Sequence, residues 1–386
     1  MLISNKVLLI TNIPTPYRIP LFNELNVQLE SRGYEFKVIF GALGYARRKW
    51  DVDLSECAFD YQVLPSKKLP SFNPEKTIFT YSGLSRLLLK ENPVAVITTA
   101  YCLATAKLWL RSWVKNVPYI IWSGAVDHEY DRDFFLRRVY RKLLVKRASG
   151  FIAYGTKAKE YLVSLGADKD KVQIGINTVD TQFFREETRK MRENRVSRND
   201  NKHLLYIGHL SPRKNVWKLL KVINELSRLR SDFVLDVVGD GEERELLEKY
   251  VFDTRLEDRV KFHGFKQKEN LPQYLAQSDC FLFQTDFDIW GLVLVEAMAA
   301  ALPCIASIHA GAAYDLIKNG ENGFTTDFSK IEEAADKINW VLMHPELARD
   351  IGENASRYVA KEASIRNSAS GFVQAIWSAL NCRLPH

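Results

Sequence analysis

The chain has 386 residues, of which 46% are hydrophobic and 26% charged, and its formal net charge is +7. These values are typical of a soluble globular protein, and no apolar run approaches the ~20 residues of a membrane-spanning helix. The five cysteines are scattered and odd in number, which argues against a disulfide framework or a zinc site and favours a reduced, cytoplasmic protein. The start of the chain predicts a core strand rather than a signal peptide.

The first part of the chain predicts an alternation of strands and helices. We expect strands at 6–10, 36–40, 94–98, 119–122, 150–153 and 172–174. We expect helices at 20–31, 82–91, 104–114, 134–148 and 156–165. Such alternation is typical of a doubly wound parallel sheet, and we place this Rossmann-like α/β domain at residues 1–178.

A polar segment then interrupts the alternation. Residues 179–202 are predicted to be a linker, because Glu186–Lys202 is almost wholly polar. A second Rossmann-like domain is expected at 203–364. Its strands are predicted at 203–207, 233–238, 260–262, 280–283 and 304–306, and its helices at 217–228, 242–252 and 271–277. Two consecutive doubly wound domains leave a cleft between them, where ligands commonly bind.

Residues 279–307 carry the strongest functional pattern. A buried strand runs into a loop, Gly291 opens a small-residue helix, and a second buried strand follows. This parallel βαβ unit places Asp288 at the carboxyl ends of the strands, which form the ligand edge of such a sheet. The helix start can hold an anion, and Glu296 can accept two hydroxyl hydrogen bonds, as from a ribose. The pattern suits a sugar joined to a nucleotide by a diphosphate.

A second strand–turn–helix element follows the predicted linker. It carries Gly208, His209, Arg213 and Lys214. Cations at such a turn favour the departure of a nucleotide diphosphate, because the leaving group gains negative charge in the transition state. A surface basic pair is the bland interpretation of Arg213 and Lys214 taken alone. Their combination with the Asp288 element favours a binding site.

The two elements together resemble the donor site of retaining GT-B glycosyltransferases of family 4. That family has two glutamates, with Pro-Phe-Gly after the first and Ala-Met-Ala after the second. The matching residues here are Asp288-Ile289-Trp290-Gly291-Leu292 and Glu296-Ala-Met-Ala. The resemblance implies that Asp288 contacts the hydroxyls of the donor sugar and that Glu296 binds the ribose. The first glutamate has become Asp, which has the same charge and one methylene less.

The resemblance extends to the turn element. Lys214 falls on the lysine of the family's Gly-Arg-Leu…Lys-Gly motif, which binds the donor diphosphate. His209 occupies the arginine position of that motif, and Arg213 is expected to supply the missing charge. The segment around His263 is similar to the one whose backbone contacts the base. The family also implies that the final helix, at about 365–386, packs back on the first domain.

The first domain resembles the family more weakly. The loop at 11–18 is similar to a Pro-x-Pro-Tyr-Arg segment found in a subset of polysaccharide-biosynthesis enzymes, and Arg18 is expected to face the cleft. The family often places a histidine after the strand at 119–122. The nearest histidine here is His128, and a plain surface-loop histidine is the alternative interpretation.

Other patterns are compatible with more than one function. Asp51-Val-Asp53 and Asp131-Arg-Asp133 match a metal-binding Asp-x-Asp, but paired acids are common and neither pair ends a strand, so we expect no metal. The basic segment Arg132–Arg147 predicts either a helix on an anionic membrane surface or a solvated face of a helix packed against the core. No recognition motif for nucleic acid accompanies this charge.

These patterns predict a glycosyltransferase with two Rossmann-like domains, and the family resemblance implies a retaining hexosyltransferase. We expect it to move glucose from UDP-glucose to a glycan or lipid-linked acceptor in polysaccharide biosynthesis, with neither a cofactor nor a metal. We expect a cytoplasmic location, with peripheral attachment to the membrane if the basic helix faces outward. A nucleotide-sugar epimerase or hydrolase of the same fold is the alternative enzyme, and a sugar-nucleotide-binding protein without turnover is the non-enzyme alternative.

Overall fold

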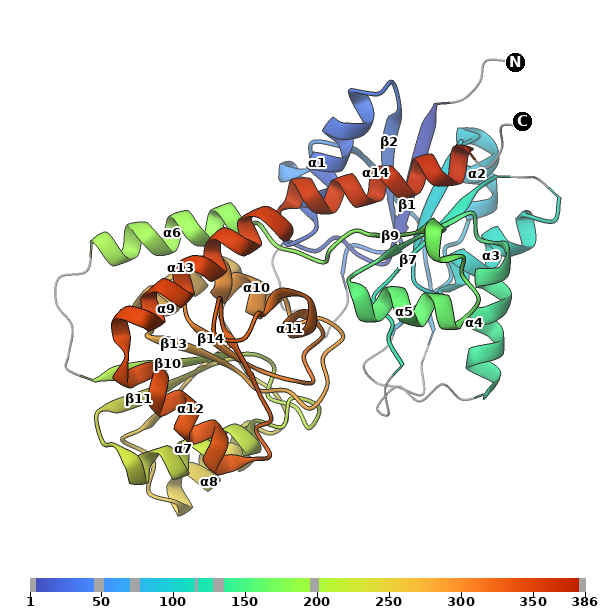
Figure 1. Ribbon diagram of the computed structural model, residues 1–386. Helices are drawn as coiled ribbons and strands as arrows, with labels where there is room; N and C mark the ends of the chain where they lie inside the picture. The colour runs from blue at the N-terminus through green and yellow to red at the C-terminus, as the bar shows by residue number, and fades with distance from the viewer. Residues whose placement is uncertain are drawn as a thin grey trace. The chain divides into compact units, whose positions relative to one another are not determined.

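The computed structural model describes residues 5–44, 52–69, 77–114, 117–127, 135–194 and 201–381. The chain forms two compact units, each built on its own parallel sheet (Figure 1). Unit 1 comprises residues 1–177 and 365–386, and unit 2 comprises residues 178–364. Within the described ranges, no helix is both long and apolar enough to cross a bilayer.

Unit 1 is a doubly wound α/β unit. Its parallel sheet has the order β3-β2-β1-β6-β7-β8-β9. The strands are β1 (Lys6–Thr11), β2 (Glu35–Phe40), β3 (Asp60–Val63), β6 (Ala95–Thr99), β7 (Tyr119–Ser123), β8 (Gly150–Ala153) and β9 (Val172–Ile174). The helices are α1 (Ile19–Glu30), α2 (Leu84–Glu91), α3 (Leu103–Arg111), α4 (Phe135–Arg147), α5 (Thr156–Ser164) and α14 (Ile365–Asn381). A small antiparallel pair, β4 (Lys68–Leu69) and β5 (Ile78–Phe79), completes the described part.

The sheet of unit 1 is buried on both faces, which explains its continuous apolar strands. In β1, Val7 and Leu9 belong to the core that contains residues of α1 and α14. Leu8 and Ile10, which point the other way, belong to the core formed with α2, α3, α4 and α5. Apolar residues at every position of a short strand therefore predicted a parallel sheet correctly.

Unit 2 repeats the architecture with a six-stranded parallel sheet in the order β12-β11-β10-β13-β14-β15. The strands are β10 (Lys202–Ile207), β11 (Phe233–Val238), β12 (Val260–Gly264), β13 (Cys280–Phe283), β14 (Cys304–Ser307) and β15 (Phe324–Thr326). The helices are α6 (Thr181–Glu193), α7 (Val216–Leu229), α8 (Arg244–Asp253), α9 (Leu271–Gln277), α10 (Leu292–Ala299), α11 (Gly311–Leu316), α12 (Ile331–Met343) and α13 (Pro345–Glu362). The strand order reverses between β10 and β13, and ligands of such sheets bind where it reverses.

The structure differs from the linker predicted at 179–202. Thr181–Glu193 form the regular helix α6, which belongs to unit 2 and contacts α9, α10 and α13. The helix begins where the side chain of Asp180 accepts a hydrogen bond from the Phe183 N–H at 3.0 Å. Its polar residues cover the solvent side, while Phe184 and Thr188 are fully buried. Residues 195–200 lie outside the described part of the chain.

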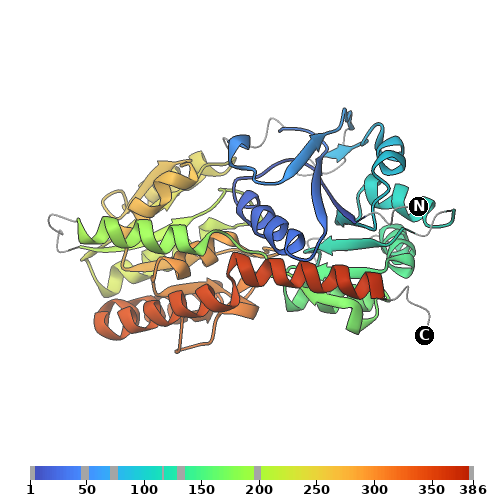
Figure 2. The ribbon, with the colours of Figure 1, turned by 90° about the horizontal axis from the view of Figure 1, so that it is seen from above.

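The last helix, α14, packs on unit 1, as the resemblance implied. It lies alongside α1 (Figure 2), and Ala375 and Ala379 join the same apolar core. The ring centroid of Phe372 is 4.9 Å from that of Trp122 on β7 in an edge-to-face arrangement. The C-terminal end of the chain is thus part of the core of the N-terminal unit.

We expect Phe372→Ala to lower the free energy of unfolding of unit 1 by about 3–5 kcal/mol, the usual effect of emptying a buried aromatic site. Trp377→Ala on the same helix is the matched control, because that ring is 42% exposed and should cost less than about 1 kcal/mol. Urea unfolding curves of the two variants would measure both effects. Equal losses would show that α14 does not seal the core as described.

Candidate active site

The turns that follow β10 and β11 form the first wall of the site. The Gly208 N–H donates to the carbonyl of Val238 at 3.0 Å, and the Leu210 N–H donates to the carbonyl of Asp240 at 3.0 Å. Gly239 has a φ of +146°, and a Cβ at this position would overlap the carbonyl oxygen of Gly208. A glycine is therefore required where the two turns touch.

A buried ion pair joins the β10 turn to the loop after β13. The Nζ of Lys214 donates a hydrogen bond to Oδ2 of Asp288, and Nη1 of Arg213 lies 3.9 Å from Oδ1 of the same carboxylate. Lys214 is only 6% exposed, and its ammonium also lies 4.7 Å from the ring centroid of Phe283. The structure thus brings together three residues that the sequence placed at one site.

Burial and charge act on this pair in opposite directions. Burial and the charge of Arg213 lower the pKa of Lys214, and Asp288 opposes that shift. Burial also tends to raise the pKa of Asp288, but the two neighbouring cations outweigh it and hold the pKa below its usual value. Asp288 is consequently ionised at neutral pH, and its charge opposes the loss of the proton from Lys214.

A second carboxylate, Asp286, fixes the same loop, and the sequence analysis missed it. It accepts hydrogen bonds from Nδ2 of Asn215 at 2.7 Å, from Nζ of Lys218 at 2.8 Å and from Nε2 of Gln284 at 3.1 Å. Burial tends to raise the pKa of Asp286, but these bonds hold it below its usual value. The Asp286 N–H also donates to the carbonyl of Arg213 at 3.1 Å. The start of α7 is therefore tied to the loop that carries Asp288.

Helix α10 begins at the edge where this loop ends. Gly291, its N-cap, has a φ of +103°, and a Cβ there would overlap the ring of Phe283. The Trp290 N–H donates to Oδ1 of Asp288 at 3.3 Å, so the acid also shapes the approach to the helix. The first N–H groups of α10, beginning with Leu292, have no acceptor within the helix and can receive one from a ligand.

Glu296 lies one turn into α10 in a partly buried position. Burial raises its pKa to about 7, and the charge of Lys268 opposes this shift only in part. Its Oε2 is a buried atom without a hydrogen-bond partner in the described chain. A buried carboxylate oxygen without a partner is costly, and a hydroxyl group of a ligand would satisfy it.

Further buried polar atoms without a described partner lie in the same segments. They are the hydroxyls of Tyr206 and Ser211, Nε of Arg213 and Nε1 of Trp290. Tyr206 lies directly beneath the first turn, because a Cβ on Gly208 would be 2.6 Å from its hydroxyl oxygen. Tyr206 and Ser211 were not predicted as site residues. No spacing rule identifies them, because only the fold places their hydroxyls below the turn.

The remaining predicted residues of unit 2 have mixed surroundings. Ile289 is 38% exposed beside Asp288. Nδ1 of His209 lies 2.5 Å from the carbonyl oxygen of Asp240, and Nε2 lies 3.2 Å from the carboxylate of Glu242. Nε2 of His263 lies 2.7 Å from Oδ1 of Asp236, so one ring nitrogen is engaged within the protein.

Arg18 and His128 are the predicted site residues of unit 1. Arg18 donates from Nη2 to the Tyr154 hydroxyl at 2.8 Å and from Nη1 to Thr11 at 3.2 Å. Its guanidinium also lies 4.5 Å from the Trp122 ring centroid. His128 lies outside the described residues.

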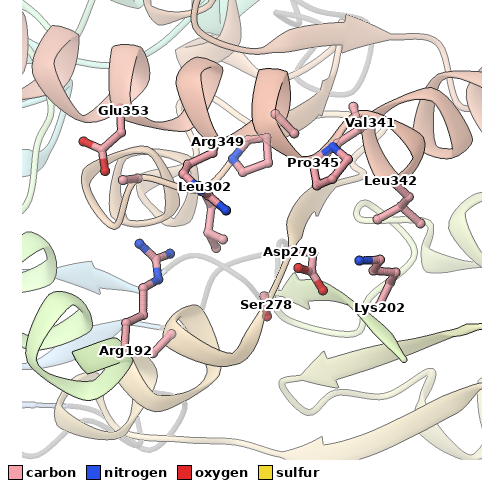
Figure 3. Close-up of a pocket in the computed structure, with 14 residues that line it drawn as sticks. Arg192, Lys202, Ser278, Asp279, Leu302, Val341, Leu342, Pro345, Arg349 and Glu353 are labelled. Atoms are coloured by element: carbon pink, nitrogen blue, oxygen red, sulfur yellow. The ribbon is translucent and has the colours of Figure 1, made fainter. Parts of the chain in front are cut away.

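A pocket of about 460 Å³ occupies the opposite edge of the unit 2 sheet (Figure 3). Lys202 at the start of β10 and Asp279 before β13 contribute to its lining, together with Arg192 of α6 and Arg349 of α13. It therefore lies at the amino ends of the strands, away from Asp288 at the carboxyl ends.

The comparisons with known proteins agree with this architecture. Residues 187–358 match the family model of the glycosyl transferases group 1. An uncharacterized glycosyltransferase of Haemophilus influenzae is 25% identical over 87% of this chain and 89% of its own length. The N-acetyl-alpha-D-glucosaminyl L-malate synthase of Bacillus anthracis is 30% identical, but the match covers only 50% of this chain and 49% of that protein.

Solved structures match nearly the whole chain. The crystal structure of Alr3699/HepE from Anabaena in complex with UDP has a TM-score of 0.76 at 19% identity, and covers 97% of this chain and 100% of that one. A sucrose-phosphate synthase from Thermosynechococcus elongatus has a TM-score of 0.75 at 17% identity, covering 98% and 100%. These likenesses establish the fold. The protein has the GT-B fold, with two parallel-sheet α/β domains.

The family match adds the class of reaction to the fold. The chain is a glycosyltransferase, and the residues that match the group 1 model, 187–358, all lie within unit 2.

The buried pair predicts strong coupling between Lys214 and Asp288. Lys214→Met and Asp288→Asn should each lower the free energy of unfolding by about 3–5 kcal/mol, because each leaves the other charge buried without its closest partner. The double variant should lose much less than the sum of the two. Urea unfolding of all four proteins would measure this. The exposed pair Lys330 and Glu333 is the control, with an expected coupling below about 1 kcal/mol. Additive losses at Lys214 and Asp288 would contradict the pairing.

The raised pKa of Glu296 predicts a pH-dependent loss of stability. The folded protein holds this proton up to about pH 7, whereas the unfolded chain releases it near pH 4.3. The contribution of Glu296 to the free energy of unfolding should therefore fall as the pH rises between these values. Above and below them, that contribution should remain level. Glu296→Gln should remove at most about 4 kcal/mol of this loss. Unfolding curves across this pH range would reveal it. The exposed Glu269→Gln variant should behave like the wild type, and identical profiles for the wild type and Glu296→Gln would refute the assignment.

Proposed function

We propose that this glycosyltransferase moves glucose from UDP-glucose to a hydroxyl of a glycan or lipid-linked acceptor in polysaccharide biosynthesis, with retention at the anomeric carbon. The observation that carries the proposal is the site at the carboxyl edge of unit 2. There the buried cation Lys214 lies in the turn next to the start of α10, and Glu296 follows with a carboxylate oxygen that lacks a partner. Positive charge and an unused hydrogen-bond acceptor match a diphosphate and a ribose respectively.

The diphosphate is proposed to bind to Lys214 and Arg213, with the N–H groups at the Gly291 helix start as further donors. As the glycosidic bond breaks, the leaving diphosphate gains negative charge, so fixed cations stabilise the transition state more than the ground state. The described hydrogen bonds hold both cations in place before the donor arrives, so little reorganisation is needed. By family resemblance the leaving phosphate itself takes the proton of the acceptor hydroxyl, without a metal ion or a covalent nucleophile.

The two acids are proposed to divide the donor between them. Glu296 would accept hydrogen bonds from the ribose, and Asp288 from the sugar hydroxyls while it holds Lys214. Asp288 already receives two hydrogen bonds from the protein, which leaves room for few others. Its short side chain therefore limits which sugar hydroxyls it reaches. The backbone of the turn at Gly208 and of the segment around His263 is proposed to face the nucleotide.

UDP as the carrier and glucose as the sugar come from likeness rather than from geometry. The Anabaena protein has been solved with UDP, with UDP and glucose, and with UDP-glucose. At 19% identity that likeness supports UDP-glucose as the first donor to test. In unit 1, Arg18 is proposed to contact the nucleotide sugar, and His128 is proposed as a catalytic residue by resemblance to the family. The enzyme is proposed to work in the cytoplasm, peripherally on the inner face of the membrane, where lipid-linked acceptors are found.

A donor screen and an acceptor-dependent assay test the proposal together. UDP-glucose should raise the melting temperature more than GDP-glucose or ADP-glucose, because a ligand of the native state stabilises it. Free UDP should appear when membrane lipid extract is added as the acceptor source, and only a trace without it. Lys214→Met should lower kcat about 100- to 1,000-fold, whereas Lys249→Met, at an exposed lysine of α8 in the same unit, should not.

Several outcomes would reject the proposal. Interconversion of sugars without free UDP would indicate an epimerase, and UDP release that ignores the extract would indicate a hydrolase. Binding without any turnover would indicate a sensor. Near wild-type kcat in a folded Lys214→Met protein would remove this lysine from the site.

A further inference from the structure

Helix α4 of unit 1 presents apolar side chains to solvent. Phe135 is 78% exposed, Leu136 72%, Val139 39% and Leu143 48%. At 3.6 residues per turn these four side chains lie within about 100° of arc, so they form a single outer stripe. Lys146 is exposed within the same arc. The outer face of this helix is therefore apolar with an embedded cation.

The inner face of α4 contains a buried cation. Arg141 is buried, donates to the hydroxyl of Tyr161 at 2.6 Å and lies 5.0 Å from the ring centroid of Tyr101. The solvated face, one of the two interpretations of this basic segment, does not include Arg141, because its guanidinium contacts tyrosines of two other segments. Leu144 and Val145 pack beside it. The buried face of α4 is therefore apolar apart from Arg141, and the outer face is apolar as well, whereas an ordinary solvated helix has a polar outer face.

The end of α3 extends the apolar surface. Trp113 is 64% exposed in the turn after α3. The guanidinium of Arg147, at the end of α4, lies 4.0 Å from the Trp113 ring centroid and donates to Oγ and the carbonyl of Ser112 at 3.0 Å each. These contacts hold the two helix ends together (Figure 1). We define the α3–α4 surface by Trp113, Phe135, Leu136, Val139, Lys142, Leu143, Lys146 and Arg147.

We propose that the α3–α4 surface docks on an anionic lipid bilayer, with its apolar side chains inserted among the lipids and its cations on the phosphates. This deepens the proposed function, since a lipid-linked acceptor would lie in such a surface. Contiguous exposed apolar side chains mark an interaction site. Interleaved Lys and Arg around aromatic and leucine side chains complement a surface that is apolar below and negative above. The net charge of the chain, +7, acts in the same direction.

Vesicle sedimentation with the full chain tests this docking, without any nucleotide sugar present. The wild type should sediment with vesicles of phosphatidylcholine and phosphatidylglycerol, and much less with phosphatidylcholine alone. Lys142→Glu/Lys146→Glu should lower the partition coefficient more than tenfold, since each cation near the bilayer contributes about fivefold. Leu136→Ser/Leu143→Ser should also lower it about tenfold by removing inserted apolar groups. Added salt should weaken the remaining electrostatic part.

Matched controls lie on α2 of the same unit. Leu89 is 59% exposed there and Lys90 is also exposed, so Leu89→Ser and Lys90→Glu should bind vesicles like the wild type. No binding by the wild type would overturn the proposal. The proposal would also be overturned if vesicle binding fell in Lys142→Glu/Lys146→Glu but not in Leu136→Ser/Leu143→Ser, because the apolar side chains would then not insert into the bilayer. A dimer in lipid-free solution that Leu136→Ser/Leu143→Ser abolishes would assign the surface to a second copy instead.

The same variants separate this docking from the sugar-nucleotide chemistry. UDP-glucose should still raise the melting temperature of Lys142→Glu/Lys146→Glu as in the wild type. If the wild type does not bind vesicles but UDP-glucose still raises its melting temperature, only the docking is rejected. Vesicle binding without any nucleotide response would reject only the proposed donor.

Discussion

The buried ion pair between Lys214 and Asp288 is the constraint on which the candidate site depends. A lysine ammonium that is almost wholly removed from water requires a partner charge. Asp288 supplies it from a different loop, so the turn after β10 and the loop after β13 must meet. Asp286 secures the same meeting through Asn215 and Lys218. Two carboxylates two residues apart therefore set the geometry of the ligand edge.

This arrangement also explains how the site can be ready before the donor binds. Lys214 is already desolvated, and both cations proposed for the diphosphate are oriented by hydrogen bonds, which favours strong electrostatic stabilisation of a transition state. The cost appears in the polar atoms that remain without partners, chiefly the Ser211 hydroxyl and Oε2 of Glu296. Such atoms are tolerated where a ligand satisfies them. The shorter side chain of Asp288 relative to a glutamate fits this view, because it forms the ion pair directly.

The sequence predicted the parts of the fold that follow from local pattern. Short strands that are apolar at every position indicated parallel sheets buried on both faces, and the spacing of Asp288 and Glu296 indicated one loop and one helix at the ligand edge. The helix α6 was missed because only two of its residues, Phe184 and Thr188, provide a strong inward signal in a polar segment. Asp286 was missed because an acid in a loop has no distinctive neighbours in sequence.

Residues whose roles depend on distant partners could not be placed from the sequence. Arg141 belongs to a basic run, yet Tyr101 and Tyr161 draw it into the core. Its inward position turns Leu136 and Leu143 toward solvent, which no count of charges would predict. Tyr206 likewise cannot be assigned to the site from sequence, because only the folded structure places its hydroxyl against Gly208. Such roles arise from tertiary contacts, and the chain carries no local mark of them.

Amide hydrogen exchange with and without UDP would test the central claim most directly, because it reports which backbone segments a ligand protects. The account predicts added protection in two stretches of unit 2, the turn at 208–215 and the loop and helix at 286–296. The pocket beside Lys202 and Arg349 should be unchanged. Protection confined to that pocket, or absent from both stretches at saturating UDP, would contradict the assignment of the site to the Lys214–Asp288 edge.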